Sequence, residues 1–298
     1  MKLVLSFLIS FSWSIEQELI TSSKESAILG KAEAAVKENG WFPSAVGQVN
    51  MNLNNYSSKT AETEAGNLQT GQLLFDGGID LRQEKHSWNN DISLKYGTAK
   101  LGKQAFRKST DEMDVKSIYL YDLYEGLSPY SSVRFESQMT KGYSYDADTG
   151  ERSTGITSTF LDPGYFTESF GFAYSPKSNI LLNIGYANKQ TFSELGLLAD
   201  DTNTTKIEFF KNEQGLEFGF DVEFSLNKTL VYKSKFLSFT NFEGTEQIDI
   251  QFKNIVSAQL TSWLVINLEH QAEKDYDQAK KDWMYKTLFS LGVQYTFI

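Results

Sequence analysis

The last stretch of the chain, residues 285–297, alternates between two kinds of side chain. One parity is apolar except at Thr287, and its members are Tyr285, Phe289, Leu291, Val293, Tyr295 and Phe297. The other parity is polar or small except at Leu288, and its members are Lys286, Ser290, Gly292, Gln294 and Thr296. Because successive side chains of a β-strand point to opposite faces, this pattern predicts a strand with one apolar and one polar face.

Composition narrows the kind of sheet that such a strand can join. The 298 residues include 22 Phe, 15 Tyr and 5 Trp, yet the mean hydropathy is only −0.37. After the N-terminus, no stretch approaches the roughly 20 apolar residues of a membrane helix. The chain is therefore either soluble or a closed barrel, the other structure that can span a bilayer. The absence of Cys rules out disulfides and Cys-ligated metals, and the net charge of −10 argues against a nucleic-acid partner.

The N-terminus has the features of an exported protein. A basic Lys2, an apolar run over residues 3–11 and small residues at 12 and 14 predict a signal peptide over residues 1–14. A buried first strand is the alternative. Residues 15–40 form a periplasmic leader in which a helix is expected over 22–40, with a capping box of Ser22 and Glu25 and a stop at Gly40. The barrel itself is expected over 41–298.

Alternating segments continue from Trp41 to the end of the chain. The predicted strands are 45–56, 69–83, 87–98, 112–124, 130–143, 163–174, 178–190, 207–226, 229–241, 246–257, 259–270 and 285–297. Long and short connections take turns between them, except at 242–245, and outer-membrane barrels combine short periplasmic turns with longer outer loops. The sequence therefore predicts an all-β, transmembrane, antiparallel up-and-down barrel of about 12 strands with a short N-terminal helix. An even strand number places both termini on the periplasmic side.

Two resemblances agree with this fold. The chain end, with Ser290, Gly292, Tyr295 and Phe297, resembles the C-terminal assembly signal of bacterial outer-membrane barrels, although Ile298 follows the last aromatic residue. Several motifs resemble a family of outer-membrane β-barrels catalogued as a domain of unknown function in Bacteroidetes-type bacteria: Trp88-x-Asn90-x-Ile92-x-Leu94-x-Tyr96-Gly97, Lys108-Ser109-Thr110-Asp111-Glu112, Gly142-Tyr143, residues 160–165 and residues 233–242. The resemblance spans roughly residues 88–297. It implies the barrel and the outer membrane of a Gram-negative envelope, and it implies no catalytic residues. The resemblance of the chain end implies recognition by the barrel-assembly machinery.

The polar parity of the predicted strands identifies the side chains expected to face the lumen. They are Asp76, Asp80, Arg82, Asp91, Lys95, Arg134, Glu136, Glu217, Asp221, Glu223, Lys233, Lys235, Asp249, Lys253 and Lys286, and the same parity also carries Lys116, Asp122 and Glu269. Strands 207–226 and 229–241 are sequential, which should bring Asp221 and Glu223 close to Lys233 and Lys235. A twelve-stranded barrel has an interior wider than one that side chains fill and narrower than the channel of a porin. The mixed charges can either close the lumen with ion pairs or line a narrow path.

The histidines, three acidic pairs and Glu168 are the remaining residues of chemical interest. His86 and His270 are the only histidines, and no nucleophile motif accompanies either of them. The acidic pairs Asp146/Asp148, Asp200/Asp201 and Asp275/Asp277 could hold Ca²⁺ or bridge lipopolysaccharide, but solvated acidic loops are the expectation. Glu168 shares the lipid-facing parity of its strand. We therefore expect it either to lie near the membrane surface or to be turned by a β-bulge that shifts the register. No cofactor or metal is expected.

These features predict a porin-like barrel without enzymatic activity that passes small polar solutes or ions through a narrow lumen. A non-conducting scaffold or partner subunit of an envelope complex is the alternative, and an outer-membrane hydrolase is a third. The expected partners are outer-membrane lipid, lipopolysaccharide and the assembly machinery. The solute, the envelope partner and the oligomeric state are not predicted.

Overall fold

A computed structural model describes residues 39–56, 66–101, 105–145, 152–177, 179–193, 208–227, 229–243, 248–274 and 283–298. The expected signal peptide, nearly all of the expected leader helix and the three acidic pairs lie outside these residues. The leader and barrel boundaries therefore stay predictions. Among the described residues, no helix is long and apolar enough to cross a membrane.

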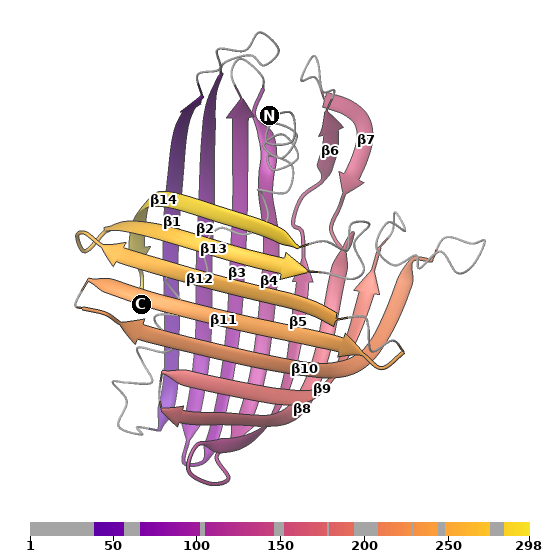
Figure 1. Cartoon of the computed structure of the whole chain (residues 1–298), viewed down its shortest axis with the longest axis vertical. Helices are drawn as coiled ribbons and strands as arrows, with labels where there is room; N and C mark the ends of the chain where they lie inside the picture. The colour runs from indigo at the N-terminus through magenta and orange to yellow at the C-terminus, as the bar shows by residue number, and fades with distance from the viewer. Residues whose placement is uncertain are drawn as a thin grey trace.

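The described part of the chain is built from β-strands. They are β1 (Gly40–Tyr56), β2 (Gly66–Gln83), β3 (His86–Leu101), β4 (Arg107–Tyr121), β5 (Leu127–Ser137), β6 (Gly142–Tyr145), β7 (Arg152–Ser158), β8 (Gly164–Lys177), β9 (Ile180–Phe192), β10 (Phe210–Ser225), β11 (Leu230–Asn241), β12 (Ile248–Gln259), β13 (Leu264–Lys274) and β14 (Met284–Thr296). Twelve of them close into one antiparallel barrel in the order β1-β14-β13-β12-β11-β10-β9-β8-β5-β4-β3-β2. Strands of the two opposite walls cross steeply, as tilted strands of a closed barrel do (Figure 1). The predicted fold class is confirmed.

The two ends of the barrel carry different connections. One end, the turn end, has short links such as 84–85 and 178–179, whereas the other, the loop end, has longer ones such as 138–163 and 193–209. The largest difference from the predicted strands is at the loop end. The strand expected over 130–143 leaves the wall after Ser137, and β6 and β7 form a separate hairpin beyond the end of β5, at about the level of the ends of β2 and β3 (Figure 1). The strand expected over 259–270 is also displaced, and β13 covers Leu264–Lys274.

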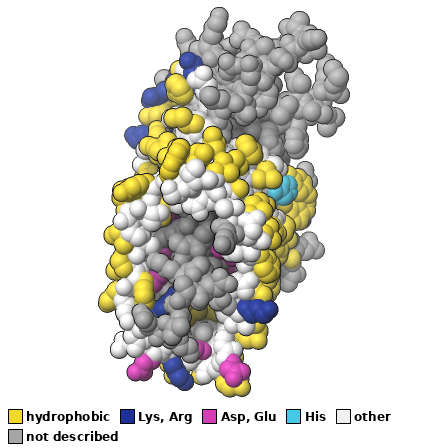
Figure 2. All heavy atoms as spheres, turned by 90° about the vertical axis from the view of Figure 1, so that its left-hand side faces the viewer, with side chains coloured by type: hydrophobic (Ala, Val, Ile, Leu, Met, Phe, Trp, Pro, Cys, Tyr) yellow, Lys and Arg dark blue, Asp and Glu magenta, His cyan; other side chains and the backbone are white. Residues whose placement is uncertain are grey.

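The wall has an apolar outer face. Large hydrophobic side chains are exposed on the predicted parity of strand after strand, among them Phe75, Val115, Phe172, Ile184, Phe218, Leu268 and Phe289. Hydrophobic side chains cover the flanks in Figure 2, and acidic and basic side chains lie within the opening. A continuous apolar surface around a closed barrel is the arrangement that meets lipid. The protein is a transmembrane β-barrel.

Glu168 is an exception on the outer face, and the register explains its position. Its strand pairs without a shift from Gly164 to Tyr174, with Glu168 opposite Val133 and Asn188, so no bulge turns it inward. Val133 is exposed on the outer face and Glu168 is exposed too. Because β8 starts at Gly164 at the loop end, Glu168 lies toward that rim, where a charge costs little.

The closing seam of the barrel joins β1 to β14. Their pairing runs from Val46 opposite Thr296 to Met51 opposite Leu291. Beyond it, the Phe297 amide donates to the Ala45 carbonyl at 2.9 Å, and a Cβ on Gly47 would lie 3.1 Å from the Phe297 ring. Phe297 thus covers a bare stretch of β1 and extends the seam beyond the last paired residues.

Candidate functional site: a charged lumen

The inner face carries the charged side chains of the wall, and the register brings opposite charges together. Asp221 lies opposite Lys235 and Glu223 opposite Lys233, as expected for sequential strands. The Lys233 Nζ is 3.3 Å from Glu223 Oε2, and both side chains are buried. Lys95 pairs in the same way with Glu112 at 2.9 Å, and Lys253 with Glu269 at 3.3 Å. Much of the inner charge is therefore neutralised between adjacent strands.

The structure places the predicted lumen residues on this inner face, with different degrees of burial. Five are buried: Asp76, Asp80, Lys95, Glu223 and Lys233. Nine are half-buried: Arg82, Asp91, Arg134, Glu136, Glu217, Asp221, Lys235, Asp249 and Lys253. The side chain of Lys286 is not among those described. Partial burial on the inside of a closed wall means that solvent reaches much of this face.

Arg134 is the centre of the tightest ion-pair cluster. Its guanidinium donates to both carboxylate oxygens of Asp114, at 3.0 and 2.7 Å, and lies 2.9 Å from Glu136 Oε1. A bidentate contact of this kind fixes the position of the planar guanidinium. Arg134 is therefore held against the β4–β5 wall.

Two sets of interactions reach beyond neighbouring strands. Lys189 of β9 lies 3.5 Å from Asp249 of β12, although β10 and β11 stand between these strands in the wall. Lys116 of β4 interacts electrostatically with Lys235 of β11 and with Asp221 and Glu217 of β10. The Lys189–Asp249 pair therefore links two non-adjacent strands on the inner face, and Lys116 lies within electrostatic range of β10 and β11.

Lys116 differs from the other inner charges. It lies opposite Asp91 and Arg134 on the inner face, yet its side chain is exposed to solvent. It forms no ion pair with any described carboxylate. Gln251, near the loop end of β12, is also exposed on the inner face. Exposed side chains inside a closed wall show that the interior contains solvent-accessible space.

Glycines on the inner face are covered by neighbouring side chains. Tyr130 lies opposite Gly171, which lies opposite Gly185, and a Cβ on Gly185 would meet the Tyr130 hydroxyl at 2.6 Å. A Cβ on Gly292 would lie 2.3 Å from Asn50 Oδ1. Gly185 and Gly292 are therefore both closely packed against neighbouring residues. They do not border open space, so a bulky residue there would disturb the wall.

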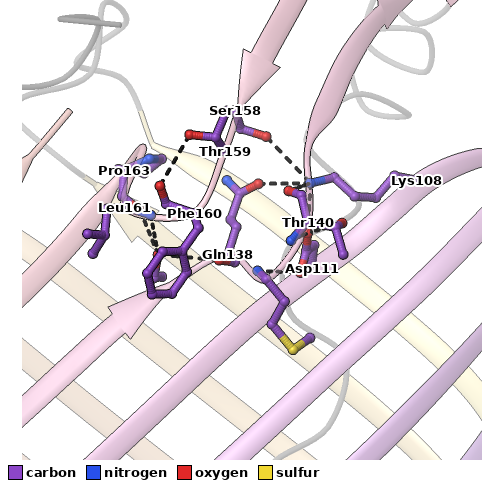
Figure 3. A network of polar contacts seen from close by, with 11 residues as sticks. Lys108, Asp111, Gln138, Thr140, Ser158, Thr159, Phe160, Leu161 and Pro163 are labelled. Carbon is purple, nitrogen blue, oxygen red and sulfur yellow. Dashed lines mark hydrogen bonds and ion pairs between the residues drawn. The ribbon is translucent and has the colours of Figure 1, made fainter. Parts of the chain in front are cut away.

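A network at the loop end holds the base of the β6–β7 hairpin (Figure 3). Asp111 is buried and accepts hydrogen bonds from the amides of Met139 and Thr140, both at 2.8 Å. Lys108 Nζ contacts Asp111 Oδ2 at 2.8 Å, the Thr140 carbonyl at 3.0 Å and Ser158 Oγ at 3.5 Å. These contacts draw the chain out of the wall after β5, which is why the strand ends earlier than alternation predicts.

The two histidines lie on the outer surface. His86 Nδ1 contacts the Tyr119 hydroxyl, and His270 Nδ1 lies 2.9 Å from Thr287 Oγ1. The His270 ring stacks on Tyr285, with centroids 6.5 Å apart. Interfacial aromatic residues of membrane barrels form such groups. Within the described ranges, no three His, Asp or Glu residues come together as a metal site would require.

Several charged residues of the lumen escaped the sequence analysis. Asp114 and Glu112 share a parity with Lys116, but the apolar Ile118 and Leu120 on that parity obscured the inner face of the strand. Lys189 was missed because the strand was recognised from its apolar face alone, and the residues of the opposite face were not assigned. If every second residue of each strand had been assigned to the inner face, whatever its type, all three would have been identified.

Comparison with known proteins adds a partial family match. A family model described as "Protein of unknown function (DUF3078)" matches residues 60–143, less than half of the chain. The match lies on β2 to β5 and agrees with the resemblance to a family of unknown function, although that resemblance was drawn over later residues as well. No curated protein matches the sequence.

Solved structures with a similar fold include an autotransporter domain, an outer-membrane channel and a porin. The translocator domain of the autotransporter NalP from Neisseria meningitidis has 12% identity and a TM-score of 0.43, covering 93% of this chain and 96% of that one. An outer-membrane channel from Pseudomonas putida F1 has 9% identity and a TM-score of 0.41, covering 88% and 96%. The NanC porin has 6% identity and a TM-score of 0.42, covering 85% and 98%. At these values only the general barrel architecture is shared.

Proposed function

We propose that this protein is an outer-membrane barrel that passes small polar solutes or ions through a restricted, charged lumen. The observation that carries the proposal is the exposed Lys116 on the inner face of a closed wall. A lumen filled by side chains would bury such a residue, because a charged group left out of an ion pair is costly to remove from water.

The ion pairs favour a narrow path over a wide one. Lys95–Glu112, Lys233–Glu223 and Arg134–Asp114 hold charged side chains against the wall. The Lys189–Asp249 contact spans several strands and reduces the free cross-section near the loop end. A path of this kind suits small hydrated solutes.

The surroundings of the barrel follow from the same proposal. Its apolar outer face meets outer-membrane lipid, and its loop end faces lipopolysaccharide. Both termini are periplasmic, so the loop end is extracellular. The exposed Tyr295 and Phe297 at the chain end act as the signal for the barrel-assembly machinery.

The test is the conductance of the purified, folded protein in a planar lipid bilayer. We expect small, steady current steps. Lys116 and Gln251 are exposed on the inner face. Lys116→Trp or Gln251→Trp should therefore reduce the size of the current steps. Tryptophan at Leu268, 46% exposed on the outer face, is the matched control and should leave it unchanged. Absence of current from folded protein would contradict a conducting lumen.

A second candidate, a non-conducting scaffold of an envelope complex, is favoured by the β6–β7 hairpin. The hairpin projects from the loop end and is held at its base by Lys108 and Asp111 (Figures 1 and 3). Its Ile156 is 41% exposed. A folded protein that inserts into bilayers but carries no current would support this function over transport.

A further inference from the structure

We infer that the lumen contains a binding site for the anionic group of a passing solute, a carboxylate or a phosphate, with Lys116 as its contact residue. The inference rests on the proposed function, because it names the class of solute that the path would favour. The inference goes beyond the proposed function by naming the contact residue in the lumen and the negative charge of the preferred solute.

The first observation is that three cations come near one another on the inner face. Lys116 of β4, which is exposed, lies directly opposite Arg134 of β5, and Lys235 of β11 lies within electrostatic range of Lys116. Like charges brought together inside a wall of limited polarity repel each other, and an anion among them relieves that repulsion.

The second observation concerns how far these cations are already neutralised. Arg134 is held by Asp114 and Glu136, and Lys235 lies opposite Asp221. Lys116 has no carboxylate at ion-pair distance among the described residues, and its side chain is exposed. Of the three, Lys116 is the one whose ammonium is left to meet a solute.

Acidic groups set a limit on what the site accepts. Asp221 and Glu217 of β10 also act on Lys116. Asp91 of β3 and Asp114 of β4 lie beside Lys116 on the inner face, where Asp114 is already held by Arg134. Glu217 accepts a hydrogen bond from Asn183 Nδ2 at 3.3 Å and makes no ion pair with a described cation. A bound anion must therefore be small enough to sit against Lys116 and away from Glu217. Inorganic phosphate and acetate are of that size.

The experiment measures chloride current through single molecules of the full chain while inorganic phosphate or acetate is added. We expect millimolar phosphate to reduce the current by about half, because a compact doubly charged anion binds a lysine more strongly than chloride does. Lys116→Gln should abolish the reduction and Lys116→Arg should retain it. Lys141→Gln removes an exposed lysine outside the barrel wall and should behave like the unaltered protein.

Comparing phosphate with acetate distinguishes a site for phosphate-bearing solutes from a site for carboxylates in general. Reduction by phosphate alone assigns a phosphate-bearing solute, whereas equal reduction by acetate assigns the wider class of carboxylates. Conductance that phosphate reduces equally in Lys116→Gln, or does not reduce in any form of the protein, overturns the site while leaving transport intact. Absence of conductance overturns both the site and the proposed function.

A second measurement checks the sign of the charge. In a KCl gradient, Lys116→Glu should move the reversal potential toward that of potassium, and Glu217→Gln should move it toward that of chloride. A reversal potential that does not change in Lys116→Glu would contradict the assignment, even if phosphate binds elsewhere.

Discussion

Asp111 shows how one residue can end a strand. Its carboxylate accepts hydrogen bonds from two successive amides, those of Met139 and Thr140, and pairs with Lys108. The two amides would otherwise extend β5 along the wall. One buried carboxylate thus decides where the wall stops and the β6–β7 hairpin begins.

Replacing Asp111 with alanine should release the base of the hairpin without unfolding the barrel. Loss of the buried ion pair and the two amide contacts is expected to cost about 3 kcal/mol. Local opening would become about a hundredfold more frequent, so trypsin should cut faster at Lys141 and Arg152. Glu243→Ala, at an exposed acid after β11, is the control. Unchanged cleavage in Asp111→Ala would show that other contacts hold the hairpin.

At the scale of the strands, glycine pairs set how closely neighbours approach. A Cβ on Gly171 would lie 2.1 Å from the Ile184 carbonyl oxygen and 2.4 Å from the Gly185 Cα. Tyr130 covers this pair from the inside, because a Cβ on Gly185 would meet its hydroxyl. Aromatic residues that cover strand glycines are a known device for shaping curved sheets.

Gly171→Ala should therefore impair folding of the barrel, whereas Gly71→Ala should be tolerated. A Cβ on Gly71 meets nothing within 4 Å. The measurement is the fraction of protein that keeps the faster migration of a folded barrel on unheated gels. We expect a large loss for Gly171→Ala and none for Gly71→Ala. Equal fractions for the two variants would mean that the β8–β9 pair can separate to admit a methyl group.

The closing seam is the other feature at this scale. β1 pairs with β2 from Gly40 to Tyr56 but with β14 only from Val46 to Met51. The shorter β1–β14 pairing should open first, because a pairing with fewer cooperative contacts has a lower free energy of local opening. Hydrogen exchange should be faster for amides of β14 between Leu291 and Thr296 than for β2 amides paired with β1. Slower exchange at the seam would contradict this order.

The sequence predicted the strands well because each wall strand has one face in contact with lipid and one with polar surroundings. Alternation is the direct result of that difference. The early end of β5 and the β6–β7 hairpin were not predictable in this way, since they depend on tertiary contacts of Asp111 and Lys108. The isolation of Lys116 also depends on which partners surround it in space, and pattern alone does not contain that information.

For the whole molecule, the essential feature is the difference between its two surfaces. Val115 and Lys116 are adjacent in β4 and both are exposed, Val115 at 38%. One faces outward among hydrophobic side chains and the other inward among charges. The two exposed side chains therefore have different surroundings, since Val115 meets lipid and Lys116 meets water.

The most direct test uses the absence of cysteine from the chain. Val115→Cys and Lys116→Cys each introduce a single thiol, and the two proteins are reconstituted into lipid vesicles and treated with a charged, membrane-impermeant maleimide. The structure predicts labelling at position 116 and little or none at position 115. Labelling at 115 as fast as at 116, or at neither position, would contradict a lipid-facing outside around a water-filled lumen.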